Sequence, residues 1–121
     1  MKIGSPKEIA KGEKRVAMTP DSALQLQKLG FDCVIESGTG ADAGFTDVAY
    51  ERAGVQVVKT AAALWKTADV VAKLRGVEAK EQKHLRAGQT VISFFWPAQN
   101  PNLMKVFKAA NANAIAMDMV P

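Results

Sequence analysis

The chain has one cysteine and one histidine in 121 residues, and it has no apolar run long enough to cross a bilayer. The lone Cys33 excludes an internal disulfide and a thiolate metal cluster, and its apolar neighbours predict a buried core position. The lone His84 argues against a metal site or a Ser-His pair, and its charged neighbours predict an exposed turn. We therefore expect no metal and no catalytic residue in this chain.

The excess of positive over negative charge is also small. The net charge is +4, and the basic residues are scattered among acids without a basic stripe interleaved with aromatics. This pattern argues against nucleic-acid binding. A hydrophobic fraction of 48% and the absence of a signal-peptide core predict one globular domain, located in the cytoplasm and not inserted in a membrane.

What the chain does have is a regular alternation of short apolar segments and helical segments. Helices are predicted to start after Thr19, Thr46, Thr60 and Asn100, which can act as N-caps, and Pro follows two of them at the first helical position. Strands are predicted over residues 2–5, 31–36, 55–58, 69–73, 89–95 and 114–119.

Strands separated by helices of this length predict right-handed βαβ units. The expected fold is a doubly wound α/β domain with a mostly parallel sheet of five or six strands and helices on both faces, Rossmann-like or flavodoxin-like. Residues 1–121 form a single domain in this interpretation. No helix follows the last predicted strand to cover it, so we expect the chain to be the front part of a longer polypeptide.

Two cations are predicted to meet at the carboxyl edge of this sheet, where α/β proteins bind ligands. Arg15 follows the first strand and Lys73 ends the fourth, so the pair could hold a carboxylate. The alternative is structural: these cations and Arg75 would pair with Glu8, Glu13 or Asp118 and hold loops in place.

A rigid corner is predicted at residues 96–101, where the fifth strand ends at Trp96 and the next helix begins. Trp96 is either a core residue, the commoner role of such a side chain, or an aromatic surface at the mouth of the crevice, with Gln99 close by. The glycine-rich residues 38–44 are spaced G-x-G-x-x-x-G and lie too far before the next helix for a dinucleotide fingerprint. A flexible surface loop is the better interpretation of that segment.

Four segments together resemble a known family: residues 3–8, 15–20, 34–40 and 96–101. They are similar to the N-terminal part of the alpha subunit of proton-translocating NAD(P) transhydrogenase, a domain type shared with alanine dehydrogenase. The resemblance covers essentially the whole chain. It implies one wall of an NAD(H) cleft, whose main cofactor contacts come from a separate Rossmann domain and a loop, both beyond Pro121.

The resemblance also implies partners: the rest of the alpha subunit, an NADP-binding beta subunit, a second copy in a homodimer, and a place peripheral to the inner membrane. No cofactor is expected to bind the 121 residues alone. Within the family, alanine dehydrogenases bind the substrate carboxylate through residues that match Arg15 and Lys73. They also use a catalytic histidine at the position of Trp96, and an indole cannot move a proton.

This departure favours a transhydrogenase, with Arg15, Lys73, Trp96 and Gln99 as candidate cleft residues. Two alternatives remain at this point. One is a fragment of an alanine dehydrogenase-like oxidoreductase, and the other is a stand-alone α/β module that binds a small carboxylate or a protein without catalysis.

Overall fold

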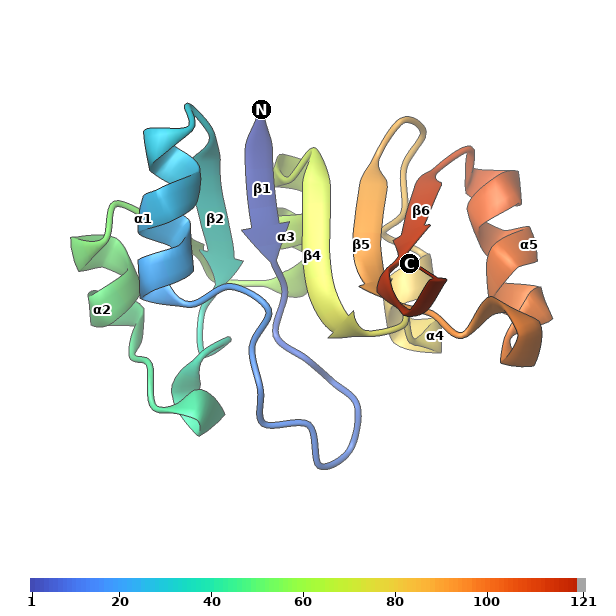
Figure 1. The fold of residues 1–121 in the computed structure, drawn as a ribbon, viewed down its shortest axis with the longest axis horizontal. Helices are drawn as coiled ribbons and strands as arrows, with labels where there is room; N and C mark the ends of the chain where they lie inside the picture. The colour runs from blue at the N-terminus through green and yellow to red at the C-terminus, as the bar shows by residue number, and fades with distance from the viewer. Residues whose placement is uncertain (120–121) are drawn as a thin grey trace.

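The structure, a computed structural model, describes residues 1–119. Val120 and Pro121, the last two residues of the sequence, lie outside the described residues. It contains one sheet of six parallel strands in the order β3-β2-β1-β4-β5-β6 (Figure 1). The strands are β1 (Lys2–Ser5), β2 (Asp32–Glu36), β3 (Gln56–Val58), β4 (Val70–Arg75), β5 (Thr90–Phe94) and β6 (Asn113–Ala116). The doubly wound α/β prediction is confirmed.

Five α-helices connect these strands. They are α1 (Pro20–Lys28), α2 (Asp47–Arg52), α3 (Ala61–Thr67), α4 (Ala79–Gln82) and α5 (Pro101–Ala110), and short 3-10 turns lie at η1 (Ala41–Ala43), η2 (Pro97–Gln99) and η3 (Met117–Met119). The one-turn helix α4 was not predicted, because four residues carry no readable helical period. The last strand also ends earlier than predicted, at Ala116, where the chain turns into η3.

The predicted N-caps hold at three of the four helices. The hydroxyls of Thr19, Thr46 and Thr60 each accept a hydrogen bond from a backbone N–H of the first helical turn. Asn100 precedes α5 as predicted, but its side chain makes no capping bond. Its amide instead bonds to the backbone carbonyls of Phe95 and Trp96.

Two hydrophobic clusters lie on opposite faces of the sheet. Cys33 and Ile35 of β2 face one cluster, which includes Tyr50 of α2, whereas Val34 faces the other, with Trp65 of α3 and Phe107 of α5. Alternate residues of a strand point to opposite faces, so β2 serves both clusters. The burial of Cys33 confirms its predicted core position.

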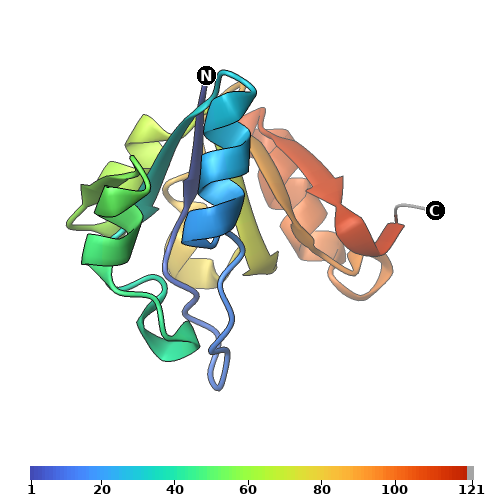
Figure 2. The ribbon, with the colours of Figure 1, turned by 60° about the vertical axis from the view of Figure 1, so that its left-hand side comes forward.

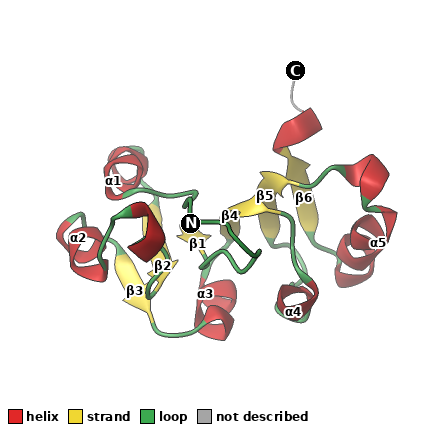
Figure 3. Ribbon diagram, turned by 90° about the horizontal axis from the view of Figure 1, so that it is seen from below, coloured by secondary structure: helices red, strands yellow, loops and turns green. Residues whose placement is uncertain are grey.

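The helices cover the two faces unequally. Figure 3 shows α1 and α2 on one side of β1 to β3, and α3, α4 and α5 on the other side of the sheet; Figure 2 gives a second view. Among the described residues, no α-helix lies over β4 to β6 on the side of α1. Ile115 of β6 is in register with Ile92 of β5, and 44% of Ile115 is exposed.

Candidate functional site

The order of the strands reverses between β1 and β4, which lie side by side at the centre of the sheet. In open parallel sheets this switch point opens a crevice at the carboxyl ends of the strands. The long loop 6–19 leaves β1 at this edge and returns to α1, as Figure 1 shows below the sheet. Arg15, Lys73 and Trp96 therefore lie at one edge, as the crevice hypothesis requires.

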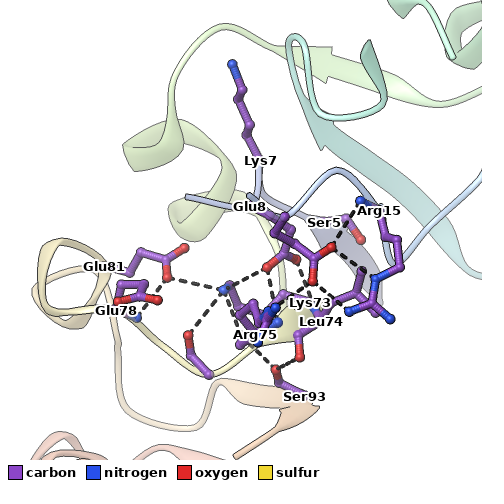
Figure 4. A network of polar contacts seen from close by, with 12 residues as sticks. Ser5, Lys7, Glu8, Arg15, Lys73, Leu74, Arg75, Glu78, Glu81 and Ser93 are labelled. Carbon is purple, nitrogen blue, oxygen red and sulfur yellow. Dashed lines mark hydrogen bonds and ion pairs between the residues drawn. The ribbon is translucent and has the colours of Figure 1, made fainter. Parts of the chain in front are cut away.

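Lys73 of β4 is buried at this edge, with none of its side chain exposed. Its Nζ lies 3.3 Å from Oε1 of Glu8 and 3.2 Å from Oε1 of Glu81. The same ammonium donates to the backbone carbonyl of Arg75 at 2.8 Å (Figure 4). Two carboxylates and a carbonyl satisfy this buried charge, so it is compensated inside the domain.

Glu8 also fastens the loop after β1 to the end of β4. Its carboxylate accepts hydrogen bonds from the backbone N–H of Leu74 at 2.8 Å and of Arg75 at 3.1 Å. Burial raises the pKa of the Glu81 carboxyl, and the nearby Lys73 ammonium opposes that shift. The Lys73 cluster, meaning Lys73, Glu8 and Glu81, thus joins three separate segments at the switch point.

A second ion-pair group lies at the surface beside this cluster. Oε1 of Glu13 is 2.7 Å from Nη2 of Arg15 and 3.0 Å from Nε of Arg75. The hydrogen bond from Arg15 is the largest influence on Glu13 and lowers its pKa to about 2, against the opposing effect of burial. The side chains of Arg15 and Arg75 remain 70% and 46% exposed.

The structural alternative predicted from the sequence is therefore present in two of its three acids: Glu8 pairs with Lys73, and Glu13 pairs with Arg75. The third acid, Asp118, accepts hydrogen bonds from backbone N–H groups instead. With Lys73 buried, Arg75 is the exposed cation at the end of β4. Residues of a strand alternate between faces. The burial pattern along β4 follows this period through Val71 and Lys73, which are buried. Arg75 has the same parity but is exposed, because it ends the strand after a register irregularity between Ala72 and Arg75. Alternation by itself therefore places both cations on one face, and only their position relative to the end of the strand separates them.

Trp96 is not a core residue. It is 44% exposed and stacks on Phe94 of β5, with ring centroids 5.9 Å apart and planes inclined by 29°. A hollow of about 230 Å³ lies beside the two rings, and Arg75 and Leu103 contribute to its lining. An aromatic pair and a guanidinium thus border one concavity, the arrangement expected of a site for a planar ring and a polar group.

Gln99 lies in η2, just after Trp96, and is exposed. It lines a second hollow of about 210 Å³ with Trp96 and Met119. Trp96 therefore separates two concavities at the carboxyl edge of the sheet.

The glycine-rich loop does not offer an anion site. The backbone N–H of Gly38 donates to Oδ1 of Asp47 at 2.9 Å, so a carboxylate of the domain already occupies this donor. A side chain at Gly40 would clash with Phe45 and Tyr50, because their atoms lie 2.8 Å from the place that a Cβ would take. Gly40 is thus explained by close packing, and because Thr39 and Gly40 are buried, the prediction of a surface loop was wrong for these two residues.

The remaining candidates of the sequence have structural surroundings. His84 lies in a turn, as predicted, but its side chain is partly buried and stacks on Trp65, with ring centroids 6.4 Å apart. The prediction that this residue is exposed was therefore wrong. No group of His, Cys, Asp and Glu side chains suited to a metal ion occurs within residues 1–119. In the same part of the chain, none of the helices has the length and apolar character needed to cross a membrane.

These features define an open, parallel α/β domain with a hollow at the carboxyl ends of β4 and β5, beside its switch point. A family model described as alanine dehydrogenase/PNT, N-terminal domain, matches residues 4–121. The chain belongs to this family.

Relatives of two kinds are similar to the chain. It is 63% identical, over all of its length, to the NAD(P) transhydrogenase subunit alpha of Cereibacter sphaeroides, and it covers 23% of that protein. It is 36% identical to the alanine dehydrogenase of Halomonas elongata, covering 99% of this chain and 32% of the relative. The chain therefore spans between about a quarter and a third of these relatives.

A solved structure supports the same grouping. The transhydrogenase from Sinorhizobium meliloti superposes with a TM-score of 0.94 at 36% identity, over all of this chain and 36% of that one. The six-stranded parallel sheet is thus the fold of this family.

Proposed function

We propose that this chain is the N-terminal subdomain of the NAD(H)-binding component of a proton-translocating NAD(P) transhydrogenase, and that its carboxyl edge forms one wall of the cofactor cleft. The observation that carries the proposal is Trp96 at the end of β5, beside the hollow that Arg75 also lines. The indole gives this edge an aromatic surface and no group that can accept or release a proton.

Direct hydride transfer between two nicotinamides needs no general base at this position. Dehydrogenation of an amino acid, in contrast, requires proton transfer. The identity of 63% to a transhydrogenase alpha subunit, against 36% to an alanine dehydrogenase, supports the same choice.

In the whole protein, a separate Rossmann domain supplies the opposite wall and the main NAD(H) contacts. The cofactor itself carries the hydride, and this chain contributes the shape and the charge of its wall. Arg75, Trp96 and Gln99 would face the cleft, with Arg15 at its rim. The component acts with an NADP-binding beta subunit, forms a homodimer and lies in the cytoplasm at the periphery of the inner membrane.

The test is a pair of assays on the full-length alpha subunit that contains this domain, reconstituted with its beta subunit in vesicles. We expect hydride transfer from NADPH to an NAD⁺ analogue with a shifted absorbance, and no NADH production from alanine. Trp96→Ala should raise KM for the NAD⁺ analogue. The matched control is Leu29→Ala, which changes a residue that is 73% exposed at the opposite edge of the sheet.

The reverse outcome, alanine-dependent NADH production without transfer between nicotinamides, would establish the alanine dehydrogenase-like alternative. The fold does not separate the two activities, since the TM-score to an L-alanine dehydrogenase is 0.92 at 33% identity, against 0.94 at 36% for the transhydrogenase. If both activities are absent and a small carboxylate binds at Arg15 and Arg75, the result would support a non-catalytic binding module.

A further inference from the structure

The backbone of residues 95–96 is held by side chains from two other elements. The carboxylate of Asp118, in η3, accepts from the N–H of Phe95 at 2.8 Å through Oδ1. Its Oδ2 accepts from the N–H of Trp96 at 3.0 Å. One carboxylate thus satisfies two consecutive backbone donors just after β5 ends, and charge-assisted bonds of this kind are among the stronger ones.

The two carbonyl groups of the same residues are held from the other side. The Nδ2 of Asn100 donates to the carbonyl of Phe95 at 2.9 Å and to that of Trp96 at 3.1 Å. This use of its amide explains why Asn100 does not cap α5. Every backbone polar group of Phe95 and Trp96 therefore bonds to Asp118 or Asn100.

The conformation that these bonds hold is a rare one. Trp96 has φ 45° and ψ 66°, in the left-handed region, and Asn111 is the other non-glycine residue with positive φ among residues 1–119. A bulky side chain seldom adopts this region, because its Cβ crowds the backbone. Such strain persists where surrounding contacts over-determine it.

We propose that Asp118 and Asn100 are positioning residues that fix Trp96 in this conformation, so that its indole is a preset surface for the planar ring of a nucleotide. The cleft role rests on the proposed function, whereas the fixing of the indole does not. In this conformation the indole stacks on Phe94, the last residue of β5, and borders the hollow that Arg75 also lines. Fixing the ring in advance lowers the ordering cost of binding.

The first experiment measures the mobility of the indole in the 121-residue chain. The buried Trp65 and the exposed Trp96 are its two tryptophans, so a Trp96→Phe variant isolates the signal of Trp96 by difference. In Asp118→Ala we expect a new nanosecond depolarisation of Trp96 emission and increased quenching by acrylamide. Asp32→Ala is the matched control, since Asp32 is exposed at the amino end of β2. Unchanged anisotropy in Asp118→Ala would overturn the positioning role.

The second experiment measures NADH affinity in the full-length alpha subunit. Asp118→Asn keeps one acceptor oxygen and should weaken NADH binding by about tenfold, the equivalent of one well-made hydrogen bond. Asn100→Ala should weaken it similarly, and Asn113→Ala, at the amino end of β6, should not. Trp96→Ala should weaken binding by itself and should abolish the effect of Asp118→Asn in the double variant.

Additive losses in that double variant would overturn the positioning role, because they would mean that Asp118 acts without Trp96. Full NADH affinity in both Trp96→Ala and Asp118→Asn would also overturn it and would remove Trp96 from the cleft wall, while hydride transfer between nicotinamides by the unmodified protein would still support the transhydrogenase assignment. Failure of the unmodified alpha subunit to bind NADH would instead overturn the proposed function, and the anisotropy result would still decide whether Asp118 fixes the indole.

Discussion

The Nζ of Lys73 lies 3.3 Å from Oε1 of Glu8, a residue 65 positions earlier in the chain, and both side chains are almost fully buried. This pair joins the loop after β1 to the end of β4. A buried ion pair contributes little net stability compared with apolar residues, but the removal of one partner leaves an uncompensated charge. The pair is therefore most sensitive to one-sided substitution.

Lys73→Met should destabilise the domain by about 3–5 kcal/mol, because Glu8 and Glu81 would remain buried without their counter-charge. Chemical unfolding followed by circular dichroism measures this loss. The triple variant Lys73→Met, Glu8→Gln, Glu81→Gln should recover a large part of it. Wild-type stability of Lys73→Met would show that the buried cluster is not held as the distances indicate.

Acid should weaken the surface group around Glu13. The pKa of Glu13 is lowered from 4.5 to about 2 in the folded chain, first by the hydrogen bond from Arg15. A lowered folded-state pKa contributes stability that is complete above the unfolded value and is lost as pH falls from about 4.5 to about 2. Because both arginines are exposed, we expect this contribution to be at most about 1 kcal/mol.

Unfolding free energies of Glu13→Gln and the unmodified chain, measured between pH 7 and pH 2, check this expectation. The difference between the two proteins should shrink as pH falls from about 4.5 toward 2, where Glu13 is protonated in the unfolded chain and begins to take up a proton in the folded one. A difference that stays constant with pH would mean that the carboxylate charge is not what stabilises this loop.

The 121 residues alone should not bind NADH appreciably. The donor of the glycine loop at Gly38 is already bonded to Asp47, and the two hollows that Trp96 lines measure about 230 and 210 Å³. These are smaller than the range of about 300–1,000 Å³ found for ligand pockets. Calorimetric titration at millimolar NADH is the measurement, and a micromolar dissociation constant would show that the domain carries the site by itself.

Trp96→His should not create alanine dehydrogenase activity in the full-length protein. An imidazole at this position would inherit the left-handed backbone that Asp118 holds, and a misplacement of about 1 Å can cost roughly a hundredfold in rate. Alanine-dependent NADH production is the assay. Ready turnover would mean that the crevice preserves an amino-acid site, and would favour the alanine dehydrogenase-like alternative.

The sequence by itself determined the parallel α/β architecture, because local signals carry it. Thr19-Pro20 and the two further threonine caps mark helix starts, and the short apolar segments between them are typical of the strands of a parallel sheet. The same local signals placed Arg15, Lys73 and Trp96 at one edge, since all strands of a parallel sheet end on the same side.

Only the tertiary structure decided which of these side chains face solvent and what holds them. Lys73 is buried because Glu8 and Glu81, distant in sequence, compensate its charge, and Arg75 is left as the exposed cation. Trp96 is exposed because Asp118, 22 residues later in the chain, accepts a hydrogen bond from its backbone N–H and holds a turn that tryptophan seldom adopts. Contacts between residues so far apart depend on how the segments pack, and no local propensity encodes them.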